Sequence, residues 1–131
     1  MKILHEYPPN FIDILKRFPG AKKQGILFTF GDIIYAPTTE NIPMELILHE
    51  RIHSKRQIKA GIEEWWKNYL ENTLFRYNEE LLAHKAEFQY FKDCDRKIRR
   101  IQLKLIAKRL SGSLYDNMVD FEKAKQELKK I

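Results

Sequence analysis

Apolar residues recur along the chain with helical spacing in most segments and as β-rich runs in one short region. Residues 26–30 and 33–36 are two such runs separated by Gly31-Asp32, which predicts a β-hairpin. No repeat or low-complexity linker divides the chain. We therefore predict an α+β fold, mostly α, in a single domain spanning residues 1–131. Helices are predicted over about 10–18, 43–60, 63–70, 74–92, 95–110 and 120–130.

The helix predicted over residues 43–60 has polar residues on one face. Two histidines, a glutamate, a glutamine and a leucine fall within one arc of about 100°. Apolar residues border this arc on both sides, as expected for a helix wedged into a core. We interpret the arc as a buried functional stripe. Its members are Leu46, His49, Glu50, His53 and Gln57.

Three residues of this stripe form the sequence H-E-x-x-H. His49 and His53 are four residues apart, so both imidazoles can reach one zinc ion from the same helix face. Glu50 is not a ligand in such a motif, but it can take a proton from a metal-bound water. A purely structural zinc site has no use for it. The motif therefore predicts a hydrolytic site that holds one Zn²⁺ per chain.

A hydrolytic zinc usually has three protein ligands and a fourth position left to water. The longer pattern H-E-x-x-H-x-x-G-x-x-H is excluded, because Arg56 and Lys59 stand where its glycine and third histidine would be. On the later helix, Glu80 shares an arc with Ala83, whose small side chain lets two helices approach. We predict Glu80 as the third ligand. The other candidates on that helix are Glu79, which points about 100° away, His84 and Glu87.

With these residues the chain resembles the gluzincins, the H-E-x-x-H metallopeptidases whose third ligand is a downstream glutamate. It is most similar to small, often phage-encoded domains of that type. The likeness extends over much of the sequence, and the zinc motif is its specific part. The segments that carry it are residues 30–36, 49–57, 65–70, 75–83 and 110–115.

The resemblance implies a zincin-like metallopeptidase domain, in which a small hairpin edge packs on the H-E-x-x-H helix and a long helix supplies the glutamate. His49, His53 and Glu80 would bind zinc, and Glu50 would be the general base of a metalloendopeptidase acting on a peptide or protein. An edge strand would bind the substrate as an added β-strand. That edge would come from residues 33–36 or from residues 26–30, which include Phe28, Thr29 and Phe30.

One position departs from the thermolysin-like members of that family. They carry an aspartate four residues after the glutamate ligand, where it orients a zinc-bound histidine, and this chain has His84 there. We interpret His84 as a second-shell donor, a transition-state donor or a plain buried histidine. Gln57 is a further second-shell candidate. The candidates for stabilising a transition-state oxyanion are Tyr35, Tyr77, Arg76 and His84.

The net charge of +6 is concentrated in one helix. Residues 96–109 contain seven lysines and arginines and no acid. Such a helix is typical either of a solvated outer face, which we favour, or of a surface for nucleic acid or an acidic partner. The alternative function is therefore nucleic-acid or partner binding through this helix, with a structural or catalytically silent zinc site.

Composition limits the location of the protein. At 131 residues and 44% apolar content, the chain can bury a core without disulfides, and its single cysteine, Cys94, indicates a reducing compartment. No apolar run is long enough to span a membrane, and the first residues lack a signal-peptide pattern. We expect a cytoplasmic protein, in the host cytoplasm if the gene is phage-borne.

Overall fold

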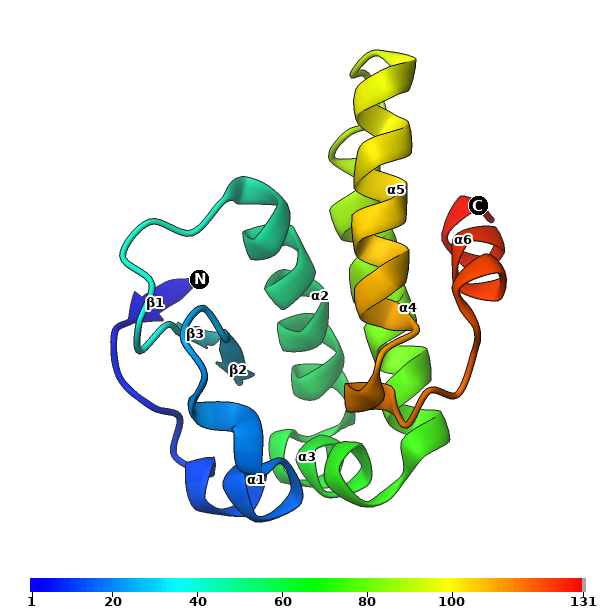
Figure 1. Ribbon diagram of the computed structural model, residues 1–131. Helices are drawn as coiled ribbons and strands as arrows, with labels where there is room; N and C mark the ends of the chain where they lie inside the picture. Colours follow the sequence, from blue (N-terminus) through cyan, green and yellow to red (C-terminus); the bar gives the residue numbers. More distant parts are fainter. Residues whose placement is uncertain (131) are drawn as a thin grey trace.

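The computed structural model describes residues 1–130 and is mostly helical, with one small sheet near the N-terminus (Figure 1). This agrees with the predicted α+β class. The three strands are β1 (Lys2–Leu4), β2 (Phe28–Phe30) and β3 (Ile33–Tyr35). The helical elements are α1 (Phe11–Arg17), the 3₁₀ turn η1 (Pro19–Lys22), α2 (Met44–Ala60), α3 (Ile62–Glu71), α4 (Thr73–Gln89), α5 (Arg96–Leu110), the 3₁₀ turn η2 (Ser113–Tyr115) and α6 (Phe121–Lys129).

The sheet has the strand order β1-β3-β2. The predicted hairpin is confirmed, because β2 and β3 pair antiparallel around Gly31, whose φ of 66° suits a tight turn. Strand β1 was not predicted; it pairs parallel with β3 and makes β3 the central strand. The expectation that residues 33–36 supply a free edge is therefore wrong. The edge strands are β1 and β2, and β2 packs on α2.

The predicted helices are all present, and local signals explain their ends. Helix α2 stops at Gly61, which has a φ of 95° that few other residues adopt. Side chains of Asn72, Asp95 and Asp120 accept hydrogen bonds from the first turns of α4, α5 and α6. Helix α4 ends at Gln89, three residues earlier than predicted, and a turn then leads into α5.

The apolar residues form two clusters on opposite sides of the buried polar stripe. One cluster joins the sheet, α1 and α3 around Trp65, Trp66 and Phe28. The other joins α4, α5 and α6 around Ile106 and Leu110. Helices α2 and α4 pack side by side between them, which places their polar faces against each other (Figure 1). Among the described helices, none combines the length and apolar character needed to cross a membrane.

Candidate metal centre

The polar stripe of α2 faces the polar side of α4, and both are buried. His49, Glu50 and His53 are each less than 10% exposed, and Gln57 is fully buried. Ala83 on α4 is also fully buried, which is consistent with its small side chain allowing close approach. The residues predicted from α2 and α4 therefore meet at the centre of the molecule.

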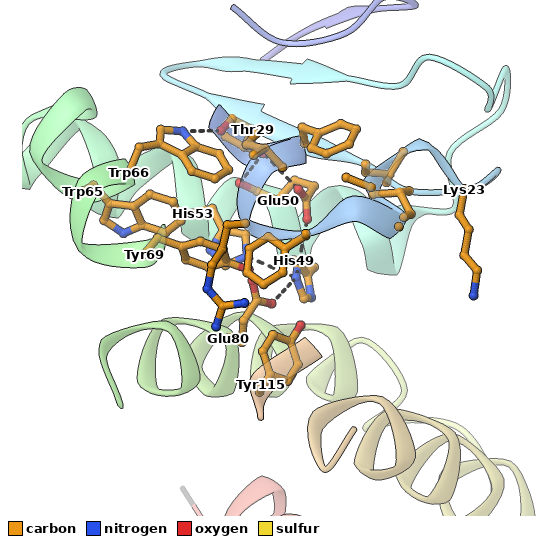
Figure 2. Close-up of a pocket in the computed structure, with 18 of the residues that line it drawn as sticks. Lys23, Thr29, His49, Glu50, His53, Trp65, Trp66, Tyr69, Glu80 and Tyr115 are labelled. Atoms are coloured by element: carbon orange, nitrogen blue, oxygen red, sulfur yellow. Dashed lines mark hydrogen bonds and ion pairs between the residues drawn. The ribbon is translucent and has the colours of Figure 1, made fainter. Parts of the chain in front are cut away.

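Glu80 of α4 lies between the two histidines of the motif (Figure 2). Its Oε1 is 3.1 Å from Nε2 of His49, its Oε2 is 3.0 Å from Nε2 of His53, and the two Nε2 atoms are 3.2 Å apart. Bonds of about 2.1 Å around a tetrahedral zinc ion separate the ligand atoms by roughly 3.4 Å. Two imidazole nitrogens and a carboxylate with one oxygen near each nitrogen, at separations only slightly shorter than this, could hold a divalent metal ion. The three residues have the arrangement of a metal-binding group.

The two other carboxylates considered as ligands have different partners. Glu79 accepts hydrogen bonds from Arg56 at 2.7 Å and from the indole of Trp65 at 2.6 Å, so it faces away from the histidines, as its helical position predicts. Glu87 accepts a hydrogen bond from Nδ1 of His49 at 3.0 Å. Glu87 therefore contacts His49 at the ring nitrogen other than the one near Glu80. Glu87 also belongs to a second group of metal-binding residue types, with His49 and His84.

The contact between Glu87 and His49 has the arrangement of a carboxylate that orients a metal-binding histidine. Glu87 accepts the Nδ1 proton of His49 and is itself paired with Arg109 of α5. A carboxylate in this place fixes the tautomer and ring orientation of a ligand and raises its basicity. Burial alone would lower the pKa of His49, but Glu80, Glu87 and Glu50 outweigh it and raise that pKa to about 10.

His84 packs its ring edge-on against that of His49, with the ring centroids 4.6 Å apart, and its shortest hydrogen bond is to the backbone. Its Nδ1 donates to the backbone carbonyl of Glu80 at 2.7 Å, one helical turn earlier. Burial and then the positive charge of His49 lower the pKa of His84 to about 4, so it is neutral at physiological pH. The negative charge next to His49 on the side away from Glu80 therefore comes from Glu87, seven residues after Glu80, and not from position 84.

Glu50 lies beside the ligands with its two oxygens in different surroundings. Oε1 accepts a hydrogen bond from the hydroxyl of Thr29 at 3.1 Å, and Oε2 is 3.5 Å from Nε2 of His49. Burial, the largest influence, raises the pKa of Glu50. A carboxylate with a raised pKa next to a metal site is suited to accepting a proton.

Two tyrosines that the sequence reading did not single out flank Glu80 (Figure 2). The hydroxyl of Tyr69 donates to Oε2 of Glu80 at 2.7 Å. Tyr115 of η2 lies on the other side of the site. Burial and then the charge of Glu80 raise the pKa of both phenols well above the usual value, so both remain protonated donors.

Three of the predicted oxyanion donors lie elsewhere. Tyr35 packs in the cluster of the sheet and α3, and Tyr77 packs in the cluster of α4, α5 and α6. Arg76 is fully buried, where it donates to the carbonyl of Tyr69 at 2.6 Å and pairs with Asp116. The structure therefore does not bring Tyr35, Tyr77 or Arg76 to the metal ligands.

The outer edge of β2 is partly occupied by side chains of the same chain. The carboxamide of Gln57 accepts from the N–H of Gly31 and donates to the carbonyl of Thr29, both at 2.8 Å. The indole of Trp66 donates to the same carbonyl at 3.2 Å. The N–H of Gly31 and the carbonyl of Thr29 are therefore already hydrogen-bonded within the chain. Fewer backbone groups of residues 28–30 are left to pair with a substrate strand.

A cavity of about 570 Å³ opens beside the ligands. Its inner wall contains His49, Glu50, His53 and Glu80, and its outer wall comes from α1, η1 and the segment before β2. The wall opposite the ligands is largely apolar. Its apolar residues include Ile14, Phe18, Ala21, Ile26 and Leu27, and Trp66 of α3 also lines the cavity.

Comparison of the chain with protein-family models, with curated proteins and with solved structures gives no match. The resemblance to gluzincins therefore depends on the sequence motif and the segments around it.

Proposed function

We propose that the protein is a zinc-dependent metalloendopeptidase of the gluzincin type. The single observation that carries this proposal is the position of Glu50. It is buried beside three metal-binding side chains and directs one oxygen toward them without being required as a ligand. A site that only holds a metal needs His49, His53 and Glu80, and it has no need of a fourth buried carboxylate.

The residues of the site have separate parts in the proposed reaction. His49, His53 and Glu80 would hold zinc, which supplies Lewis-acid chemistry by polarising a carbonyl and lowering the pKa of water. Oε2 of Glu50 accepts a proton from the attacking water and then gives it to the leaving amine, so the proton balance closes. We assign Tyr115 as the donor to the developing oxyanion, because its phenol stays protonated and lines the cavity.

The cavity supports a peptide substrate. Its largely apolar outer wall offers surface for side chains next to the scissile bond, while the carboxylates and imidazoles lie together on the inner wall. A structural zinc site is normally closed by four protein ligands, whereas this one has three and adjoins an open space.

The alternative function, nucleic-acid or partner binding through α5, has weaker support. Arg109, the last of its seven basic residues, is paired with Glu87. Exposed Ile98, Ile101 and Leu105 interrupt the basic surface, and phosphate groups have no use for aliphatic side chains. Tight DNA binding with a steep dependence on salt would favour this alternative.

The proposal is tested with Glu50→Gln. The zinc-loaded wild type should cleave members of a peptide library at neutral pH, and chelation should abolish the cleavage. Glu50→Gln should retain zinc but lose about a hundredfold or more in kcat, because an amide does not accept the proton. Glu45→Gln, the same change in the first turn of α2 and outside the metal-binding group, is the matched control and should behave as wild type. Unchanged cleavage by Glu50→Gln would refute the mechanism.

A further inference from the structure

The carboxylate of Glu50 needs a defined orientation if one particular oxygen is to take the proton. The terminal torsion of a glutamate side chain is broad, so the rotamer alone does not set the direction of its two oxygens. In this site the oxygens are distinguished by their partners. Oε1 accepts from the hydroxyl of Thr29, and Oε2 is the oxygen nearer Nε2 of His49. The hydroxyl therefore determines which oxygen faces the metal ligands.

Thr29 is itself held from two sides. Its carbonyl accepts hydrogen bonds from Gln57 of α2 and Trp66 of α3, at 2.8 and 3.2 Å. Gln57 also accepts from the N–H of Gly31, and its side chain is fully buried. The helix that carries Glu50 thus also fixes the strand that carries Thr29. A side chain on backbone held this firmly is suited to orienting another group.

Burial does not explain why this position has a threonine. Thr29 is 2% exposed in the middle of a strand, where valine has the same shape and a better fit to an apolar surface. A buried hydroxyl is retained when it has a partner. Its shorter contact is with Oε1 of Glu50, at 3.1 Å, and the longer one is with the backbone carbonyl of the same residue, at 3.4 Å.

We infer that Thr29 is a positioning residue for the general base, because its hydroxyl holds Oε1 of Glu50 and leaves Oε2 directed at the reacting water. The inference rests on the proposed peptidase function. Thr29 need not touch the substrate or the metal in this role. It acts through Glu50 alone. Its substitution should therefore change kcat, whereas substitution of a residue needed only for folding should change stability.

The test compares Thr29→Val, which keeps the shape and removes the hydroxyl, with Thr29→Ser, which keeps the hydroxyl. Thr29→Val should lower kcat about tenfold, a typical size for a misplaced catalytic group, with KM and zinc content close to wild type. Thr29→Ser should stay within about threefold of wild type. Ile34→Val is the matched control, because Ile34 is the buried partner of Thr29 across the hairpin.

Two further measurements separate positioning from a structural effect. In the Glu50→Gln background, Thr29→Val should cause no additional loss of kcat, since the group it positions no longer accepts a proton. A crystal structure of metal-free Thr29→Val should show the Glu50 carboxylate rotated or in two orientations. An undiminished kcat in Thr29→Val, or an equal loss in the Glu50→Gln background, overturns the inference while the peptidase function stands. Absence of cleavage by the wild type overturns both.

Discussion

The two faces of α4 carry opposite chemistry within one helix. One face presents Glu80, His84 and Glu87 to α2, and all three are buried and polar. The other presents Tyr77, with Leu81 and Phe88 at its edge, to the apolar cluster of α5 and α6. The polar face is held by directed contacts at distances near 3 Å. The apolar face is held by packing, which has no direction and depends on the area removed from water.

This difference indicates how the chain keeps a buried polar site. Charges removed from water are costly unless they are paired, and the carboxylates here would repel one another without the histidines and Arg109. The apolar cluster of α4, α5 and α6 stabilises the fold. The buried polar residues can therefore serve metal binding and need not supply stability. Substitutions on the two faces should therefore affect different properties.

The largest effect is expected at the third ligand. Glu80→Gln replaces a charged oxygen donor by a neutral amide, so we expect the zinc affinity to fall at least a hundredfold. Metal analysis of the dialysed protein measures this. Glu79→Gln, which changes the neighbouring buried carboxylate, should keep one zinc per chain. Loss of zinc in Glu79→Gln together with retention in Glu80→Gln would show that the ligand is wrongly assigned.

On the apolar face the effect should appear in stability alone. Ile106 is fully buried, and Ile106→Ala should lower the free energy of unfolding by about 2–5 kcal/mol, because it removes buried methyl groups and leaves a cavity. Chemical denaturation gives the value, and zinc content should be unchanged. Ile98→Ala on the exposed side of the same helix is the control and should cost little.

Glu87 connects the polar site to α5, because it contacts both His49 and Arg109, and its substitution tests whether this contact affects metal binding. Glu87→Gln keeps a hydrogen-bond acceptor for Nδ1 of His49 but removes the negative charge, so zinc affinity should fall about 10–100-fold. Competition with a chromophoric chelator measures it. Glu71→Gln, an exposed change on α3, is the control. An affinity equal to that of wild type would indicate that Glu87 serves only to pair Arg109.

Whether a residue of the site could be predicted from the sequence depends on how far apart in the chain the contacting residues lie. The candidate ligands on α2 were predictable, because their spacing is local, and the position of Glu80 beside them followed from the arc it shares with Ala83. Tyr69 and Tyr115 were not predictable, because only tertiary packing decides which aromatic residues turn toward a site. Tyr35 and Tyr77 were expected at the site, and tertiary packing places them in the two apolar clusters.

The sheet shows the same limit. Strand β1 has three residues and no alternation that a sequence pattern would reveal, and its pairing with β3 joins segments about thirty residues apart. The metal-facing part of the fold was therefore predicted from helical geometry, whereas the edges of the sheet were not.

A smaller effect concerns pH in the metal-free protein. The pKa of His49 is about 10 in the folded chain against an ordinary value of 6.5. A raised folded pKa stabilises the protein below the unfolded pKa, and this stabilisation is lost as pH rises through the folded value. The free energy of unfolding of chelator-treated protein should therefore fall from about pH 6.5 to about pH 10. Denaturation across this range tests it, and His49→Gln should flatten the profile.

The smallest effect is expected on the outer face of α5. Arg99, Arg100 and Lys104 are exposed and form no ion pair among the described residues. Neutralising all three should leave the fold, the zinc content and the peptidase activity unchanged. Binding of DNA by the wild type that is sensitive to salt and lost in the triple variant would overturn this expectation.

The bonds that Gln57 makes to β2 also bear on solubility. A strand at the edge of a sheet exposes unpaired backbone groups that can template pairing with another chain and begin aggregation. Here a buried carboxamide from a helix takes the place of a neighbouring peptide group at Thr29 and Gly31. The small sheet is thus closed on this side by the side chains of Gln57 and Trp66, of which Gln57 bonds both backbone groups, and Gln57→Ala should increase the tendency of the protein to aggregate through that edge.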